Sequence, residues 1–447
     1  MIEQLYQAYL CSRTVTTDSR NITPGCLFFA FKGERFDGNA FAPQALEQGA
    51  ALCVISDPQY KVDDRCILVP DVLATLQELA REHRRHLTIP VVGITGTNGK
   101  TTTKELVHAV LAKRYKTSAT KGNFNNHLGV PLTLLSIPEN TEIAIVEMGA
   151  NHPGEIAFLC GIADPDCGLI TNVGRAHLEG FGSFEGVIQT KTELYRHLAA
   201  KGERLKVKGE RYPTVFANAD NPILISHLSP LTSHLTYGRS QEADVRGTLV
   251  TDSSNQAIKQ SSNPYLHFYF EVGDNVYNVR THLLGAYNFD NCMAAVAVGL
   301  HFGVEPWDIK EAIEEYVPSN QRSEWKQTDR NSLYLDCYNA NPSSMEAAIT
   351  SFKNMGGTMA VIGGMHELGA DERKEHERVV AQLEECHLER VLLVGPEWAP
   401  LPHPANMLLF PDTEAVTAYL KEHPVSGATI LVKGSNTNRL WTLEELL

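Results

Sequence analysis

The sequence lacks the cysteine spacing, the long apolar runs and the basic excess that characterise several classes of protein. Its 9 cysteines are an odd number and include no C-x-x-C pair, which argues against a disulfide framework or a structural zinc site. No run approaches about 18 apolar residues, and the N-terminus has no basic region followed by an apolar one. A net charge of -14 disfavours nucleic acid as a partner. We therefore expect a cytoplasmic protein with free thiols and no membrane insertion.

The length of the chain predicts several domains. With 447 residues, 43% of them hydrophobic, the chain exceeds what one core organises, and about three domains are expected. Strand-like runs alternate with helix-like segments, which predicts an α/β fold. Along the chain we expect a small N-terminal α/β module, then a central domain with a parallel sheet, and then a C-terminal domain with a Rossmann-like sheet. Alternation such as Leu266–Val272 predicts an antiparallel insertion between about 234 and 284. The predicted domains are 1–86, 87–316 and 317–447.

One segment has the pattern of a phosphate-binding loop. Residues 91–102 read Val-Val-Gly-Ile-Thr-Gly-Thr-Asn-Gly-Lys-Thr-Thr, an apolar strand followed by a glycine turn and a predicted helix to about Ala112. Such a turn directs backbone N–H groups and a helix N-terminus at one anionic volume, which suits the phosphates of ATP. The predicted contacts are Gly96, Thr97, Asn98, Gly99, Lys100, Thr101 and Thr102. Ile94 stands at the first glycine of the general pattern, which indicates a particular subfamily.

Polar residues at predicted strand ends extend this site. Glu147 follows the apolar run Ile143–Val146, and it could hold a Mg²⁺ ion that Thr101 also touches. A strand-end carboxylate without a metal is the alternative. His177 and Lys191 lie 14 positions apart around a loop that leads to a predicted helix near Ser183. Taken by residue type alone, both are surface residues.

The hexad Gly96–Thr101 resembles the ATP-binding loop of the Mur ligases and of their folylpolyglutamate ligase relatives. Further blocks follow in the order of that family and cover most of the chain. They are Gly122-Asn-Phe-Asn-Asn-His-Leu-Gly-Val-Pro131, Ile145-Val-Glu-Met-Gly149, Ile170–Leu178 with Thr190–Glu193, His282–Asn291, Asp336-Cys-Tyr-Asn-Ala-Asn-Pro-Ser-Ser-Met345 and Val432-Lys-Gly-Ser435. The resemblance implies an ATP-dependent, ADP-forming peptide ligase that works through an acyl phosphate.

The resemblance also implies roles for single residues. Lys100, His177 and Lys191 would be catalytic, with His177 at a second Mg²⁺ and Lys191 carrying a carbamate formed with CO₂. A carbamate is an anion that can approach Mg²⁺, but its formation needs a neutral amine and hence a lowered lysine pKa. Asn288 would read adenine. Arg322 and Asp336 would reach the γ-phosphate and the ribose, although an ordinary ion pair at a domain boundary is the alternative.

One branch of the family fits best. The block at 336–345 and Gly363-Gly-Met-His-Glu-Leu-Gly369 resemble the ligases that add D-Ala-D-Ala to UDP-N-acetylmuramoyl-tripeptide during peptidoglycan precursor synthesis. Asp18-Ser-Arg20 and the segment 31–38 resemble a uridine-nucleotide domain that folate ligases lack. The implied substrate contacts are Ser19, Arg20, Lys32, Gly33, Asn125, Asn126, Asn339 and Asn341. Gly364 and Asn436 depart from the pattern, where aspartate and arginine are common.

Two other classes of function are weaker. A switch GTPase would need the guanine-specific Asn-Lys-x-Asp, which the chain does not contain. A non-catalytic binding protein with the same fold would be indicated by the loss of Glu147, His177 or Lys191, and all three are present. Because the implied contacts come from three domains, we expect the third domain to close on the second, which a monomer can do.

Overall fold

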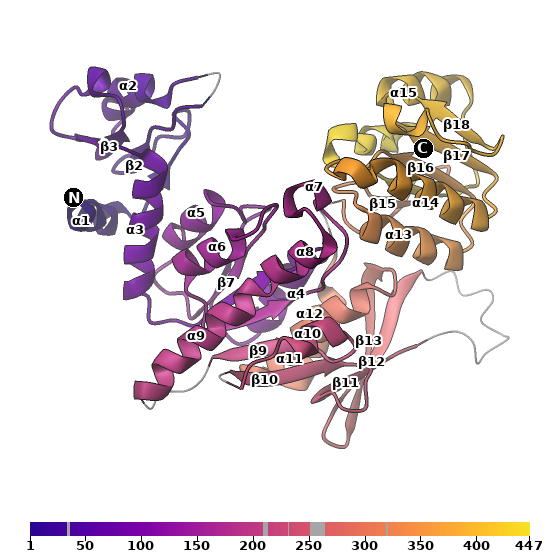
Figure 1. Ribbon diagram of the computed structural model, residues 1–447, viewed down its shortest axis with the longest axis horizontal. Coiled ribbons are helices and arrows are strands. Elements are labelled where there is room, and N and C mark those ends of the chain that lie inside the picture. The colour runs from indigo at the N-terminus through magenta and orange to yellow at the C-terminus, as the bar shows by residue number, and fades with distance from the viewer. Residues whose placement is uncertain (34–35, 209–212, 231, 251–263, 319–320) are drawn as a thin grey trace.

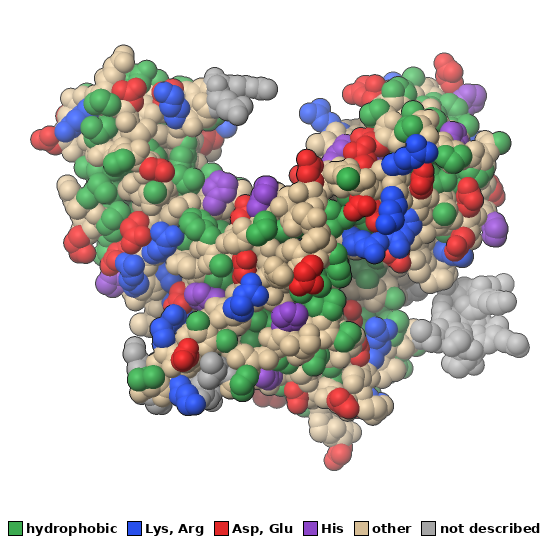
Figure 2. All heavy atoms as spheres, in the orientation of Figure 1, with side chains coloured by type: hydrophobic (Ala, Val, Ile, Leu, Met, Phe, Trp, Pro, Cys, Tyr) green, Lys and Arg blue, Asp and Glu red, His purple; other side chains and the backbone are tan. Residues whose placement is uncertain are grey.

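The computed structural model describes residues 1–33, 36–208, 213–230, 232–250, 264–318 and 321–447. Within these ranges the strands form three sheets, of four, nine and six strands. Figure 1 shows the N-terminal and C-terminal sheets on either side above the central sheet. In Figure 2 the surface is hollowed between these two flanking parts. Residues 34 and 35 of the predicted uridine segment lie outside the described ranges.

The N-terminal sheet is parallel and small. Its order is β1-β2-β3-β4, and every neighbouring pair runs parallel. The elements are α1 (Ile2–Ser12), β1 (Val15–Thr16), β2 (Leu27–Phe29), α2 (Ala42–Glu47), β3 (Leu52–Ile55), β4 (Cys66–Leu68) and α3 (Val72–His86). Asp71 caps α3 by accepting a hydrogen bond from the backbone N–H of Ala74 at 2.9 Å. Since α3 contacts α1 and also α5 and α6 of the central part, it joins the first two sheets.

The central sheet has the order β13-β12-β11-β10-β9-β8-β5-β7-β6. Its strands are β5 (Val91–Thr95), β6 (Thr117–Ala119), β7 (Ile143–Glu147), β8 (Cys167–Ile170), β9 (Thr214–Asn218), β10 (Ser233–Gly238), β11 (Val245–Leu249), β12 (Tyr265–Val272) and β13 (Asn275–Leu284). The predicted antiparallel insertion is partly wrong. The pairs β11–β12 and β12–β13 are antiparallel, whereas β10 pairs with β9 and with β11 in parallel, and all four strands extend one sheet. Alternation reports which face of a strand is buried, and it does not report the direction of the strand.

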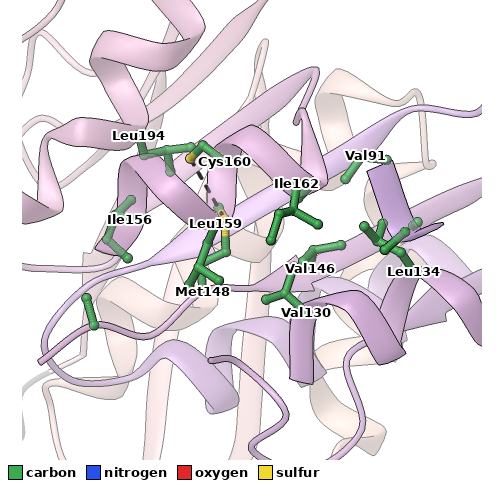
Figure 3. Close-up of a cluster of buried hydrophobic side chains, with 14 of the residues drawn as sticks. Val91, Val130, Leu134, Val146, Met148, Ile156, Leu159, Cys160, Ile162 and Leu194 are labelled. Carbon is green, nitrogen blue, oxygen red and sulfur yellow. Dashed lines mark hydrogen bonds between the residues drawn. The ribbon is translucent and has the colours of Figure 1, made fainter. Parts of the chain in front are cut away.

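Helices cover both faces of the central sheet. One face carries α4 (Lys100–Ala112), α11 (Asn288–His301) and α12 (Pro306–Glu315), and the other carries α5 (Gly129–Leu135), α6 (Glu155–Ala163) and α9 (Glu193–Lys208). Short helices α7 (Leu178–Phe181), α8 (Phe184–Lys191) and α10 (Pro222–Ser226) complete this part. Figure 3 shows Leu159 and Cys160 of α6 beside Met148, the residue after β7, and Ile162 of the same helix near Val146 of the strand. The Cys160 and Met148 sulfurs are 3.8 Å apart.

The C-terminal sheet has the order β14-β15-β19-β16-β17-β18. Its elements are β14 (Glu324–Gln327), β15 (Ser332–Asp336), α13 (Pro342–Asn354), β16 (Met359–Gly363), α14 (Glu372–Glu385), β17 (Arg390–Val394), β18 (Met407–Phe410), α15 (Thr413–Glu422) and β19 (Thr429–Lys433). The predicted second α/β sheet is confirmed, with β14 as an antiparallel edge. The boundaries at 86/87 and 316/317 stay predictions. No described helix is long and apolar enough to cross a membrane.

A buried cation fastens α3 to the central part. Arg84 is 8% exposed, and its guanidinium donates to the carbonyls of Ala163 and Asp164 at 2.8 Å each and to the Asp166 carboxylate at 2.8 Å. Lys201 from α9 donates to the same aspartates at 2.7 to 3.0 Å. Since buried charges are costly unless they are paired, this network specifies how α3 sits on the sheet.

Replacing Arg84 by methionine tests this network. Arg84→Met roughly keeps the side-chain volume but removes the side-chain donor to the carbonyls of Ala163 and Leu87 and one donor to the Asp166 carboxylate, and we expect a loss of about 2 kcal/mol in unfolding free energy. Urea unfolding followed by circular dichroism measures it. Arg85→Met on the same helix is the control, because that side chain is 59% exposed and should change stability by less than about 0.5 kcal/mol. Equal effects of the two substitutions would contradict a structural role of the buried network.

Candidate functional site

The phosphate-loop segment folds as a strand, a glycine turn and a helix. All of β5 is buried, and Gly96 follows it with φ 141°. A Cβ atom on Gly96 would lie 2.0 Å from Thr171 Oγ1, and one on Gly99, whose φ is 76°, would lie 2.5 Å from Asn291 Oδ1. Neither position accepts a side chain without displacement of its neighbours. The loop therefore needs both glycines, and α4 begins immediately after it.

The end of β8 fixes this loop from the side. The backbone N–H of Thr97 donates to the carbonyl of Asn172, and the N–H of Asn98 donates to the Asn172 side chain, both at 3.0 Å. The Thr171 hydroxyl donates to the Asn98 carbonyl at 2.6 Å. Because β5 and β8 are neighbours, the carboxyl ends of two parallel strands build the loop together.

Lys100 lies against its own loop, where its Nζ donates to the carbonyls of Gly96 and Thr97 at 2.9 Å each. Burial lowers the pKa of Lys100 to about 8, with Glu147 opposing and the Arg322 cation contributing. Lys100 in turn contributes to the lowered pKa of His177 and of Lys191, although burial is the larger cause for both. These basic side chains are therefore close enough to influence one another, and an anion such as a polyphosphate would favour their charged forms.

Glu147 has the surroundings of a cation ligand. It ends β7, is 1% exposed, and its Oε1 accepts hydrogen bonds from Asn125 at 2.7 Å and from the Thr101 hydroxyl at 3.3 Å. Its Oε2 is buried and has no hydrogen-bond partner. A buried carboxylate oxygen without a partner is costly, and a hard cation such as Mg²⁺ would satisfy it. Thr101, Glu147 and Asn125 therefore fit a magnesium ion beside the loop.

Lys191 is buried at the end of α8, contrary to the surface position that its residue type alone suggests. It is 2% exposed, its Nζ donates to the Ala150 carbonyl at 3.3 Å, and the same atom lies 5.3 Å from the centroid of the Phe181 ring. Burial holds the pKa of Lys191 well below its ordinary value. This favours the neutral amine that reacts with CO₂.

A cavity of about 690 Å³ lies between the central and C-terminal parts. The cavity is lined by the phosphate loop, by Thr101, Glu147 and Asn125 of the possible magnesium site, and by several side chains of the third part. They include Thr97, Asn98, Gly99, Lys100, Thr101, Thr102, Asn125, Asn126, Glu147, His177, Asn288, Arg322, Asp336 and Asn339. Lys191 is not among the lining residues, but its Nζ contacts the carbonyl of Ala150, which does line the cavity. The structure thus brings most of the predicted residues to one place.

The third part contributes a buried ion pair and polar contacts to the loop. Lys433 Nζ lies 2.6 Å from an Asp336 carboxylate oxygen, and the Arg322 guanidinium carbon lies 3.7 Å from the centroid of the Tyr338 ring. Asn341 caps α13 and also donates to the Asn98 side chain at 2.8 Å. The Asn341 side chain therefore forms a contact between the central and C-terminal domains.

Other predicted contacts lie in the N-terminal part, or line the cavity but already have hydrogen-bond partners within their own part of the chain. Ser19, Arg20, Lys32 and Gly33 belong to the N-terminal part, and Arg20 is 88% exposed on the side chain and paired with Asp18. Asn126 accepts the backbone N–H of Gly129 at 2.9 Å, and Asn339 accepts the N–H of Ala340. The Asn288 side chain donates to the Leu284 carbonyl at 2.6 Å and accepts from the Asn291 amide at 2.8 Å, so it already has two partners. The roles of these residues stay predictions.

Sequence reasoning missed some residues of the site. Lys433, Asn172 and Tyr338 line the cavity and were not among the predicted contacts. Lys433 ends β19, and Asn172 follows β8 by two positions. The rule that singled out Glu147, a polar residue at the carboxyl end of a parallel strand, applies to both.

Comparison with known proteins decides the family. Residues 13–84 match the Mur ligase family catalytic domain, residues 94–299 the Mur ligase middle domain, and residues 321–436 the Mur ligase glutamate ligase domain. The UDP-N-acetylmuramoyl-tripeptide–D-alanyl-D-alanine ligase of Bacillus subtilis is 36% identical over 439 residues, covering 95% of this chain and 91% of that protein. The chain belongs to the Mur ligase family. The enzyme of the same description from Escherichia coli is 34% identical and covers 97% of this chain and 93% of its own length.

Solved Mur ligase structures share the architecture. MurF from Acinetobacter baumannii has a TM-score of 0.83 and 28% identity, with 97% of this chain and 92% of that chain covered. The MurF ligase from Thermotoga maritima, solved in complex with ADP, has a TM-score of 0.82 and 28% identity, with 98% and 97% covered. The predicted three-domain α/β fold of this Mur ligase is thereby confirmed.

Adding a methyl group to Gly99 tests the nucleotide loop. Gly99→Ala imposes a left-handed backbone on alanine and presses its Cβ against the Asn291 amide, so we expect the affinity for Mg-ADP to fall about tenfold or more, which is about 1.4 kcal/mol. Isothermal titration calorimetry measures it. Gly122→Ala is the matched control, since Gly122 has φ 54° but nothing lies within 4 Å of its Cβ position. Similar losses in both variants would exclude a specific effect at the loop.

Proposed function

We propose that this Mur ligase joins D-Ala-D-Ala to UDP-N-acetylmuramoyl-tripeptide with hydrolysis of ATP to ADP and phosphate, in cytoplasmic peptidoglycan precursor synthesis. The observation that carries the proposal is the buried Glu147 with an open oxygen beside the Lys100 loop, in a cavity shared by two domains. The relatives that match almost the whole chain bear this activity in their names. We expect it to act as a monomer, because closure of the third domain on the second needs only one chain.

The reaction begins with activation of a carboxylate. An oxygen of the tripeptide's terminal carboxylate attacks the γ-phosphorus of ATP. The bond from that phosphorus to the oxygen bridging the β- and γ-phosphates breaks, ADP departs, and the tripeptide is left as an acyl phosphate. Lys100 would release the carbonyls of Gly96 and Thr97 and pair with the β- and γ-phosphates. Arg322 would approach from the third domain. Preorganised cations of this kind supply most of the stabilisation in phosphoryl transfer.

The second step forms the amide. The amine of D-Ala-D-Ala attacks the carbonyl carbon of the acyl phosphate, loses a proton, and the carbon–oxygen bond to phosphate breaks. Water competes with the amine for the acyl phosphate, so contact between the second and third domains protects this intermediate. The paired amides of Asn98 and Asn341 are one such contact.

Two magnesium ions complete the proposed site. Thr101 and Glu147 would hold the first, and His177 with a carbamate on Lys191 would hold the second, where the ions neutralise charge on the transferred phosphoryl group. Over the part of the chain that the structure describes, no three His, Cys, Asp or Glu side chains cluster as a metal site. The second ion therefore depends on the carbamate, which would provide the missing anionic oxygens.

The remaining assignments follow the family resemblance. Asn288 would read adenine, and Asp336 would bind the ribose once Lys433 shares its carboxylate. Ser19, Arg20, Lys32 and Gly33 would bind the uridine nucleotide, while Asn125, Asn126, Asn339 and Asn341 would contact the peptide portions. A folate ligase is disfavoured because the chain has the N-terminal module and matches named D-Ala-D-Ala ligases along its length.

The substrate requirement tests the proposed function. Purified protein should release phosphate from ATP only when UDP-N-acetylmuramoyl-tripeptide and D-Ala-D-Ala are both supplied, because each half-reaction needs its acceptor. A coupled phosphate assay measures this. Equal turnover with a free amino acid and the dipeptide precursor, or with tetrahydrofolate and glutamate, would overturn the assignment.

Removal of the Lys191 side chain tests the carbamate. Lys191→Ala should lower turnover by several orders of magnitude, and formate or acetate should restore part of it by supplying an anion in the space left by the lysine. Steady-state rates over a range of formate or acetate concentrations measure the rescue. A small amine is the control. Rescue by the amine instead, or full activity of the variant, would remove the carbamate from the mechanism.

A further inference from the structure

A contact between domains holds the proposed metal ligand His177. Its Nδ1 lies in hydrogen-bond contact with the Glu367 carboxylate, which belongs to the loop after β16 in the third domain. A backbone bond joins the same two segments, because the N–H of Glu179 donates to the Glu367 carbonyl at 3.3 Å. The imidazole of the central domain is therefore oriented from the C-terminal domain.

Both partners have unusual backbone conformations. His177 has φ 51° and Glu367 has φ 60°, in the left-handed region that residues other than glycine rarely adopt. Such conformations persist where the surrounding structure fixes them, and they cluster at functional sites. Two residues in this state facing each other across a domain boundary indicate a contact that the fold maintains against a local cost.

Neighbouring contacts hold the His177 loop against the same domain. The N–H of Arg175 donates to Ser343 Oγ at 2.8 Å, and its guanidinium lies 3.3 Å from the carboxylate of Glu375, which is 3% exposed. The Phe181 ring stands edge-on to the imidazole, with centroids 6.4 Å apart. The position of the loop therefore depends on the C-terminal domain at several points, and Glu367 is the one that reaches the imidazole.

We propose that Glu367 is a positioning residue that fixes His177 for metal binding. A carboxylate that accepts the Nδ1–H of an imidazole selects the tautomer in which Nε2 carries the free lone pair, and it raises the basicity of that nitrogen. The proposal rests on the proposed function, in which His177 meets a magnesium ion. It adds that the second metal site is assembled from two domains and reaches full affinity only when the third domain packs against the 174–179 loop.

Manganese binding provides a test that does not depend on turnover. Mn²⁺ is titrated into the full-length protein with a non-hydrolysable ATP analogue, and bound metal is counted by electron paramagnetic resonance. Of the two Mn²⁺ sites, the one of lower affinity should lose about 10- to 100-fold in affinity in Glu367→Ala, which is the range for loss of a carboxylate that hydrogen-bonds a metal ligand. Glu367→Gln, which keeps an acceptor of the same shape, should lose less. Glu179→Gln is the control. Glu179 is an exposed carboxylate two residues from His177, and the variant should bind Mn²⁺ like the parent protein.

The outcomes separate the possible roles. Tighter Mn²⁺ binding in Glu367→Ala would mean that the carboxylate competes with the metal for His177, and it would overturn the proposal. Unchanged binding would overturn it as well, provided that His177→Ala still loses the second site. If His177→Ala also binds two Mn²⁺ ions normally, the metal role of His177 in the proposed function fails. The isosteric glutamine variant decides the question if the alanine variant does not fold.

Discussion

The site depends on the side-by-side position of β8, β5 and β7 in one parallel sheet. Their carboxyl ends supply, in that order, the Asn172 segment, the glycine loop and Glu147. Because the strands are only about 5 Å apart, groups that follow them are forced into contact without any long side chain. The loop needs glycine at 96 and 99 because neighbouring side chains, Thr171 and Asn291, already fill the space beside it.

Burial sets the charge state of this arrangement as much as proximity does. Lys100 and Lys191 are amines removed from water, and burial lowers the pKa of both. The charge of Lys100 lowers the pKa of Lys191 further. Without an anion this is an unfavourable state, and it becomes favourable when a polyphosphate or a carbamate supplies the opposite charge. The same cost that would destabilise an ordinary core therefore prepares the site for anionic ligands.

Sequence reasoning succeeded where the relevant signal is local. The strand before Gly96, the helix after it, the carboxylate at the end of Ile143–Glu147 and four strands of the third sheet, β15, β16, β17 and β19, follow from runs of adjacent residues. It failed where pairing partners decide. The direction of β10 and β11 is set by the strands with which they pair. β14 is a short, mostly polar edge strand, and its four residues do not by themselves indicate a strand. The amide pair between Asn98 and Asn341 joins positions 243 residues apart, and neither residue type predicts the other.

The two flanking parts are attached to the centre by different forces. One continuous apolar cluster runs from Tyr9 and Phe29 of the N-terminal part to Val146 of the central sheet. The apolar cluster of the third part takes in Leu284 and the partly buried Tyr265 of the central sheet. Most of the contact is polar, because the third part meets the loops after β5 and β8 through amides, hydroxyls and ion pairs such as Arg175 with Glu375. Apolar cohesion is lost only on unfolding, whereas polar contacts exchange readily with water. Three sheets therefore make two cooperative units, and heat or denaturant should release the third part before it separates the first from the second.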